Sequence, residues 1–196
     1  MMTIMKKTSR FSIALIAVLL IGGVGCSGEG AGEKAATPAD TSAPEEQTAA
    51  IEAPFRNAVL VGDVLTGGQP TSEELAALAE QGYLTVINLR MPGEDMTTIE
   101  AAEELGMSYV SLPIDGPAGL TEENAIAFAE LLGELDGPAV IHCGSGNRVG
   151  AMYALKAFYV DGMTAEEALA VGYEAGLTRL NRSVREQLGL IETSPE

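Results

Sequence analysis

The sequence contains few basic residues, one His and two Cys. Its 196 residues include 11 Lys and Arg against 28 Asp and Glu, with a formal net charge of −17. Proteins bind nucleic acids largely through Lys and Arg contacts to phosphates, so this composition, without any basic cluster, argues against nucleic-acid binding. A single His and scattered acids offer no ligand cluster. The sequence therefore predicts a protein that uses no metal and no other cofactor.

Apolar residues are concentrated at the N-terminus, in a run that is short for a membrane span. A positive segment (residues 1–10) precedes an apolar run (11–21) and four small residues that end before Cys26. This order is typical of a signal peptide. A spanning helix needs about 20 apolar residues, and an uncleaved anchor helix that extends through Val24 is the alternative. The segment resembles a bacterial lipoprotein signal, although Gly23 stands where Leu is usual.

That resemblance implies a signal peptide over residues 1–25, lipid on Cys26, and a membrane tether without a spanning segment. The protein is then exported and lies in the periplasm or at the cell surface. Cys26 and Cys143 are the two cysteines. A disulfide between them would join a flexible tail to a functional loop, so a lipidated Cys26 and a lone Cys143 thiol form the simpler account.

Residues 26–54 are rich in Gly, Ala, Pro, Thr, Ser and Glu and have almost no large apolar side chain. Such a segment cannot bury enough surface to fold, which predicts a disordered linker. A folded domain is predicted over residues 55–190.

Strand and helix patterns alternate through this domain. Thr71 and Glu74 have the spacing of a helix capping box. Strands are predicted at 59–61, 64–65, 84–89, 109–112 and 139–141, and helices at 71–82, 98–105, 121–132 and over most of 149–190. The alternation predicts an α/β fold with a mostly parallel sheet flanked by helices.

The loop at 142–148 follows the last predicted strand and precedes a helix that we expect to begin near Val149. Ligands of open α/β sheets bind at the carboxyl ends of strands. Gly144 and Gly146 allow the backbone to turn its N–H groups inward around an anion. Arg148 offers a charged fork for two oxygens of an oxyanion. We expect Cys143 to lie at the base of this positive bowl as a nucleophile.

Simpler interpretations exist for each of these residues. Cys143 can be a small buried side chain at a strand end, with both glycines serving only a turn. His142 is interpreted as a structural residue that supports the loop rather than as the acid.

Three motifs carry a resemblance to a known family. They are Gly68-Gln69-Pro70, the strand from Thr85 to Arg90, and the loop from His142 to Arg148. The last resembles the signature of Cys-dependent protein tyrosine and dual-specificity phosphatases. All three, in this order, resemble the phosphatase-like domain called beta-lactamase hydrolase-like.

The resemblance implies a dual-specificity-phosphatase-like fold and a phosphomonoesterase that acts through a phosphocysteine intermediate on a phosphorylated protein or small molecule. Cys143, Arg148 and Asp115 are then the catalytic residues, with Asp115 as the general acid. The implied substrate-binding residues are Gly144, Ser145, Gly146, Asn147 and Arg90. Asp115 can equally be a turn residue, and Arg90 can equally form a surface ion pair, for example with Glu94.

Two departures keep other functions open. Four residues separate Cys143 from Arg148, whereas tyrosine phosphatases have five. A four-residue loop also resembles that of rhodanese-type sulfurtransferases, which carry a persulfide. Val149 follows the arginine where phosphatases commonly place Ser or Thr. This substitution favours a third hypothesis, a non-catalytic module that binds phosphate.

Overall fold

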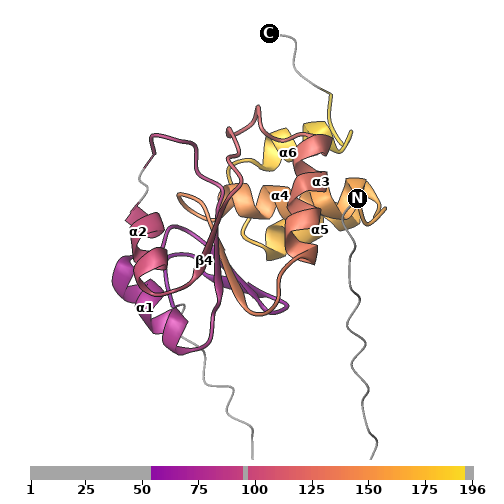
Figure 1. Cartoon of the computed structure of the whole chain (residues 1–196). Helices are drawn as coiled ribbons and strands as arrows, with labels where there is room; N and C mark the ends of the chain where they lie inside the picture. The colour runs from indigo at the N-terminus through magenta and orange to yellow at the C-terminus, as the bar shows by residue number, and fades with distance from the viewer. Residues whose placement is uncertain (1–53, 95–96, 193–196) are drawn as a thin grey trace, which may run out of the picture. The chain divides into compact units, whose positions relative to one another are not determined.

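The computed structural model describes residues 54–94 and 97–192 (Figure 1). The predicted signal peptide, Cys26 and the predicted linker as far as residue 53 lie outside the described residues. Within the described ranges, no helix has the length and apolarity that a membrane crossing requires.

Five short strands form one sheet in the order β1-β2-β5-β3-β4. The strands are β1 (Val59–Val61), β2 (Val64–Gly67), β3 (Thr85–Asn88), β4 (Ser108–Ser111) and β5 (Ala139–His142). Strand β1 pairs with β2 in the antiparallel sense, while the other neighbours are parallel. The predicted α/β class with a mostly parallel sheet is confirmed. Strand β5 lies at the centre, so its carboxyl end meets the ends of both β2 and β3.

Helices cover both faces of this sheet, with α1 and α2 on one side and α3 to α6 on the other (Figure 1). They are α1 (Ser72–Glu80), α2 (Thr97–Glu104), α3 (Glu122–Gly133), α4 (Asn147–Tyr159), α5 (Ala165–Glu174) and α6 (Asn181–Gln187). Alternate strand residues point to opposite faces. Val86 and Val140 therefore pack in the clusters on the α1 side, and Ile87 and Ile141 pack in the larger cluster with α3 and α4.

Threonine residues fix where three of the helices begin. The Thr71 hydroxyl accepts a hydrogen bond from Glu74 N (3.2 Å), and the Glu74 carboxylate accepts one from Thr71 N (2.7 Å). This reciprocal pair satisfies two N–H groups that the first turn leaves without partners. Thr164 forms the same box with Glu167, and Thr121 caps α3 through its side chain. The capping box predicted at Thr71 is confirmed.

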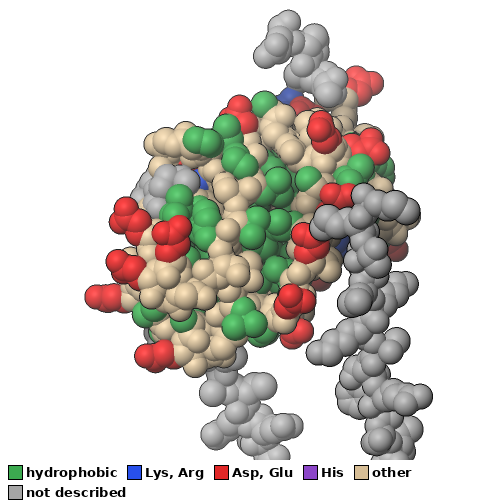
Figure 2. Space-filling model, in the orientation of Figure 1, with side chains coloured by type: hydrophobic (Ala, Val, Ile, Leu, Met, Phe, Trp, Pro, Cys, Tyr) green, Lys and Arg blue, Asp and Glu red, His purple; other side chains and the backbone are tan. Residues whose placement is uncertain are grey.

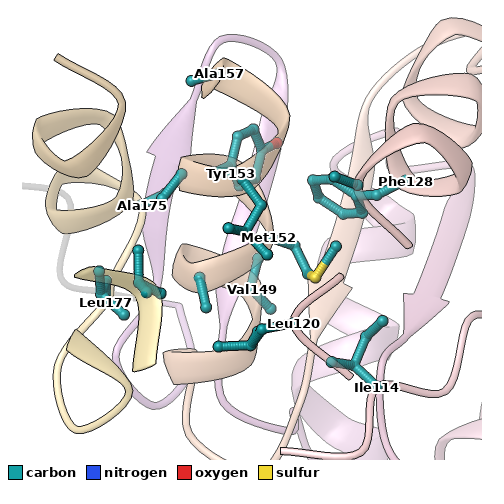
Figure 3. Packing of buried hydrophobic residues seen from close by; sticks show 14 of the residues in the cluster. Ile114, Leu120, Phe128, Val149, Met152, Tyr153, Ala157, Ala175 and Leu177 are labelled. Atoms are coloured by element: carbon teal, nitrogen blue, oxygen red, sulfur yellow. The ribbon is translucent and has the colours of Figure 1, made fainter. Parts of the chain in front are cut away.

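Helix α4 lies within the main core, between α3 on one side and the chain after α5 on the other. Figure 3 shows Met152 on the side of Phe128, and Ala175 and Leu177 across the helix. The Phe128 and Tyr153 rings meet edge to face at 5.2 Å. A Cβ on Gly150 would lie 2.1 Å from Leu177 N, so only glycine allows this approach. The close contact brings the segment before α6 to the beginning of α4.

Candidate active site

The carboxyl end of β5 places Cys143 inside the molecule. The Cys143 amide donates to Gly67 O (3.2 Å), which extends the pairing of β5 with β2 by one residue. Leu89 N donates to the carbonyl of His142 (2.9 Å) from the other side. The Cys143 side chain is 1% exposed and still contributes to the wall of a pocket. The sulfur is therefore fixed at the base of a cavity that opens to solvent.

A loop of four residues, Cys143 to Gly146, connects β5 to α4. Helix α4 begins at Asn147, two residues before the predicted start, so Arg148 lies in the first turn of the helix. Gly146 has a φ of 85°, a conformation that other residues rarely adopt, and its Cβ would lie 3.3 Å from the Gly67 backbone. Gly144 does not use the left-handed region. Of the two predicted loop glycines, only Gly146 is required by its backbone conformation.

A pocket of about 500 Å³ opens above Cys143. It brings together six of the eight residues that the sequence predicts as catalytic or substrate-binding, and it leaves out Gly146 and Arg90. The six are Cys143, Arg148, Asp115, Gly144, Ser145 and Asn147.

Arg148 is held by Glu94 through two parallel hydrogen bonds. Nη1 donates to Glu94 Oε1 (2.9 Å), and Nη2 donates to Oε2 (2.8 Å). Nη1 also donates to the carbonyls of Leu89 (3.3 Å) and Ile114 (3.2 Å). These bonds occupy Nη1 and one proton of Nη2. The Nε proton and the second Nη2 proton, on the adjacent edge of the guanidinium, are left for Cys143 and a bound oxyanion.

Electrostatics keep this pair charged. The hydrogen bond from Arg148 is the main factor that lowers the pKa of Glu94 to about 2, and bonds from Met91 N and Arg90 act in the same direction. The hydrogen bond with Glu94 in turn raises the pKa of Arg148, and interaction with the Cys143 sulfur adds to that shift. Glu94 is consequently ionised at any pH at which the protein is expected to work.

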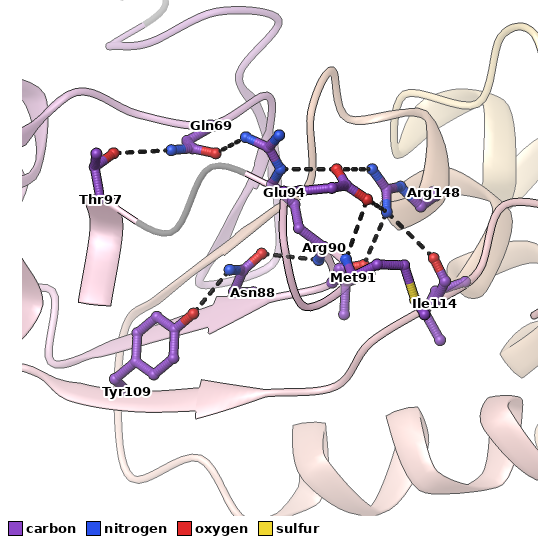
Figure 4. A network of polar contacts seen from close by, with 10 residues as sticks. Gln69, Asn88, Arg90, Met91, Glu94, Thr97, Tyr109, Ile114 and Arg148 are labelled. Carbon is purple, nitrogen blue, oxygen red and sulfur yellow. Dashed lines mark hydrogen bonds and ion pairs between the residues drawn. The ribbon is translucent and has the colours of Figure 1, made fainter.

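Arg90 contributes to the site through Glu94. Its Nε donates to Glu94 Oε2 (2.9 Å), and its Nη1 donates to Gln69 Oε1. Gln69 Nε2 continues the chain to Thr97 Oγ1 (3.1 Å) (Figure 4). The three sequence motifs of the family resemblance thus meet in one network, because Gln69, Arg90 and Arg148 belong to one motif each. The predicted pairing of Arg90 with Glu94 is confirmed, and direct contact of Arg90 with substrate stays a prediction.

Asp115 lies on the loop after β4, exposed, in the wall of the pocket. Its backbone is fixed within a tight turn, because Gly119 N donates to Asp115 O (2.9 Å). A Cβ on Gly119 would lie 2.6 Å from Asp115 N, so the turn requires glycine there. The turn interpretation of Asp115 thus agrees with the structure, and Asp115 also lines the pocket; its role as the general acid stays a prediction.

The Asn147 side chain holds a neighbouring loop. Its Oδ1 accepts hydrogen bonds from Thr178 N (2.8 Å), Thr178 Oγ1 (3.1 Å) and Leu180 N (3.2 Å). These bonds fix the segment before α6 against the first turn of α4. His142 is fully buried at the end of β5, which agrees with a supporting role.

Sequence reasoning missed several residues of the pocket wall. They are Arg56, Met91, Glu94 as the partner of Arg148, Gly116, Arg179 and Leu180. Glu94 alone carried a signal, through its spacing from Arg90. Arg56 and Arg179 come from distant segments with no motif around them, so only the tertiary structure reveals them.

Known proteins resemble this chain in sequence and in fold. A beta-lactamase hydrolase-like protein of Xylella fastidiosa is 32% identical over 123 residues, which cover 60% of this chain and 28% of that protein. The chain thus spans about a quarter of the length of this relative.

Two solved structures share the fold. TpbA of Pseudomonas aeruginosa has a TM-score of 0.56 at 18% identity, over 70% of this chain and 86% of that one. The catalytic core of the PP-IP phosphatase SIW14 of Saccharomyces cerevisiae has a TM-score of 0.50 at 16% identity, over 68% and 85%. At these identities the likeness concerns the fold.

The predicted family resemblance is confirmed by these relatives and by a family match. Residues 52–187 match the family described as DSP-PTPase phosphatase fused to NAD+ kinase. Since the match extends over most of the chain, this protein belongs to that family of phosphatases.

Proposed function

We propose that the chain is a Cys-dependent phosphomonoesterase with Cys143 as the nucleophile. The thiolate attacks phosphorus, so that an S–P bond forms while the P–O bond to the leaving group breaks. The observation that carries this proposal is the position of Cys143. It lies at the base of the pocket, one loop away from the start of a helix of 13 residues that carries Arg148 in its first turn.

Unused N–H groups around the loop support the binding of an oxyanion. Among the described residues, the amides of Gly144, Ser145, Gly146 and Asn147 donate no hydrogen bond to another group. Successive free amides at a helix N-terminus form a site for a phosphate group. Together with the free edge of Arg148, they would bind the nonbridging oxygens and stabilise the charge that develops in the transition state.

Asp115 would supply the proton for the leaving oxygen. It reaches the pocket from the loop after β4, on a different element from Cys143. After the alcohol leaves, the Asp115 carboxylate would take a proton from water as the water attacks the phosphocysteine. That step breaks the S–P bond, releases inorganic phosphate and regenerates the thiolate.

The substrate is a phosphorylated molecule in this proposal. TpbA has been crystallised with phosphotyrosine, and SIW14 is a PP-IP phosphatase. The shared fold is therefore compatible with both protein and small-molecule phosphates.

Sulfur transfer is the second candidate, favoured by the length of the loop. Four residues separate Cys143 from Arg148, and α4 begins directly after Gly146, so the bowl is small. The Cys143 thiolate would attack the outer sulfur of thiosulfate and release sulfite. The resulting persulfide would then pass its sulfur to an acceptor such as cyanide.

Two assays on the same samples separate these functions. We expect the purified chain to release phosphate from an aryl phosphate in the presence of a chelator, and we expect Cys143→Ser to lose that release. Thiocyanate formation from thiosulfate and cyanide, dependent on Cys143 and without phosphate release, would replace the proposal by the sulfurtransferase. Binding of phosphate without either turnover would indicate the non-catalytic module.

We propose that the protein acts outside the cytoplasm, held to a membrane by lipid on Cys26. The support is the order of charged, apolar and small residues before that cysteine. Cell fractionation tests this proposal with the wild type and Cys26→Ala. Transfer of the variant from the membrane to the soluble exported fraction is expected. A variant that stays in the membrane would indicate an uncleaved anchor helix instead.

A further inference from the structure

Two arginines that the phosphatase mechanism does not use lie at the pocket. Arg56, just before β1, and Arg179, just before α6, belong to the same wall as Cys143 and Arg148. Both side chains are exposed, in contrast to the half-buried Arg148. Two segments that lie more than a hundred residues apart in the sequence thus each contribute one arginine to the same cavity.

These two arginines have no carboxylate partner among the described residues. Seven Lys and Arg lie in the described ranges. Four of them form ion pairs: Arg90, Arg148, Lys156 and Arg182. Of the remaining three, Arg56 and Arg179 line this pocket, while Arg185 does not. In a chain with 28 acidic residues, cations left unpaired at one cavity indicate an anionic ligand.

The segment that carries Arg179 is fixed to the catalytic loop. The guanidinium donates through Nη2 to Ser145 Oγ (3.2 Å). The residues on either side of it, Thr178 and Leu180, donate their amides to Asn147 Oδ1. Asn147 is 8% exposed, so this attachment is largely shielded from water.

The segment that carries Arg56 is attached to the same loop. Gly68 N donates to Arg56 O (2.8 Å), and Asn57 Nδ2 donates to Ser145 O (3.1 Å). Asn57 has a φ of 54°, the one non-glycine residue with a positive φ in the described part of the chain. A backbone conformation of this kind is strained and persists only where contacts with neighbouring residues stabilise it. Ser145 therefore accepts a hydrogen bond from each segment. These bonds fix the positions of both arginine-bearing segments before a ligand binds.

We infer that Arg56 and Arg179 form a second anion subsite. It lies beside the phosphate bowl, the loop from Cys143 to Arg148 that would bind the phosphate under attack. On the basis of the proposed function, the preferred substrate is a small molecule that carries a second phosphate near the one attacked by Cys143. Arginine forks bind phosphate oxygens in pairs, so they suit a further phosphoryl group better than a neutral ring. A pocket of about 500 Å³ accommodates a ligand of that size.

Binding to full-length Cys143→Ser tests the subsite without turnover. The probes are 1-propyl phosphate and the bisphosphates of 1,2- and 1,3-propanediol, compared by calorimetry at constant ionic strength. We expect at least one bisphosphate to bind about tenfold more tightly than the monophosphate, a factor that corresponds to about 1.4 kcal/mol. Adding Arg56→Gln and Arg179→Gln should bring that ratio close to one.

Arg185→Gln is the matched control, because it removes the same charge from an unpaired arginine outside the pocket. It should leave the ratio unchanged. Equal affinity for the bisphosphates and the monophosphate would overturn the inference. So would an affinity ratio that persists in the double substitution, or one that falls equally in Arg185→Gln. Turnover by the Cys143 form is a separate readout: its absence would count against the phosphatase proposal, whereas the affinity ratio alone decides on the subsite.

Discussion

At the scale of single residues, the pocket depends on Glu94, a carboxylate in its wall that has no chemical role in the proposed mechanism. Glu94 accepts hydrogen bonds from Arg90, Met91 and Arg148, and thereby fixes which edge of the Arg148 guanidinium points toward the bowl. Arg148 has five donors, and Glu94 and two carbonyls take the ones on the outer edge. The orientation of the Arg148 guanidinium is thus determined by Glu94 and two backbone carbonyls, before any ligand binds.

Replacing Glu94 by Gln should lower kcat/KM for an aryl phosphate by about 10- to 100-fold, because hydrogen bonds to charged groups contribute about 1.5–3 kcal/mol. Steady-state kinetics measures this loss, and Glu94→Asp should restore part of it if position and charge matter. Full activity in Glu94→Gln would contradict a positioning role.

The ion pair of Glu94 with Arg148 predicts that the stability of the protein depends on pH. The pKa of Glu94 falls from 4.5 to about 2 in the folded protein. A carboxylate with a lowered folded pKa stabilises the protein above its unfolded pKa and loses that contribution as the pH falls through the folded value. The difference in urea midpoint between wild type and Glu94→Gln should therefore be constant above about pH 4.5 and should shrink toward pH 2. A difference that grows on acidification would contradict this assignment.

The two loop glycines should respond differently to substitution. Gly146→Ala places a Cβ at a φ of 85° and 3.3 Å from Gly67, which should destabilise the loop and reduce phosphate release at least tenfold. Gly144→Ala meets only Arg148 Nη2 at 3.8 Å, an ordinary contact, and should retain the fold. Urea unfolding of both variants makes the comparison. Equal losses of stability would show that the backbone assignment of this loop is wrong.

At the scale of elements, helix α4 links the core to the chemistry. Its first turn carries Asn147 and Arg148, and its buried face packs between Phe128 and Leu177. The free N–H groups at its start and its dipole both favour a bound anion. Because the same helix is clamped in the core, the position of the phosphate bowl is as fixed as the packing of α4.

Gly150 is the contact on which that clamp depends. Gly150→Ala would force a Cβ to 2.1 Å from Leu177 N, a backbone atom that cannot move aside cheaply. Overpacking of this kind costs about 1–3 kcal/mol or more. A urea titration should show the loss, while Gly133→Ala, whose Cβ meets nothing within 4 Å, should be neutral or slightly stabilising. A stable Gly150→Ala variant would mean that α4 and the segment after α5 are not in this contact.

The elements were predictable where local rules decide them. The capping box of Thr71 with Glu74 and the strand that contains Val86 and Ile87 are local patterns, and the structure has both at the predicted places. The start of α4 was placed two residues late because the conformation of Gly146 depends on its contact with Gly67, which is distant in sequence.

The same reason limits prediction of the site. Cys143 and Arg148 follow from one short motif, whereas the partnership of Glu94 with Arg148 crosses 54 residues of chain. Arg56 and Arg179 line the same pocket because Ser145 is hydrogen-bonded to both of their segments, and Asn147 also binds the Arg179 segment. Functional residues within one loop can be predicted from the sequence, whereas a site assembled from several loops cannot.

At the scale of the whole molecule, the protein carries a large negative charge around a cationic pocket. Residues 55–196 contain 22 acidic and seven basic residues, and acidic side chains are spread over the face in Figure 2. Self-repulsion of this kind destabilises the compact state. Substrate phosphates are repelled by most of the surface and attracted at the pocket, so the few unpaired arginines have a disproportionate effect on which anions bind.

Salt should consequently stabilise the protein. Raising NaCl from 0.01 M to 0.1 M shortens the Debye length from about 30 Å to about 10 Å and screens the repulsion. The Tm should rise by about 2–4 °C for each kcal/mol that is relieved. Differential scanning calorimetry, repeated with tetramethylammonium chloride to exclude a specific sodium effect, measures this. A Tm that falls with salt would indicate that ion pairs outweigh the repulsion.

The central claim, that Cys143 attacks phosphorus, is tested most directly by trapping the intermediate. The full chain is mixed with an aryl phosphate, quenched in acid within milliseconds and analysed by peptide mass spectrometry, with Asp115→Asn examined in parallel. We predict a phosphoryl group on the peptide that contains Cys143 and none on the corresponding peptide of Cys143→Ser. Phosphate release by the wild type without any phosphocysteine, or release that persists in Cys143→Ser, would contradict the mechanism.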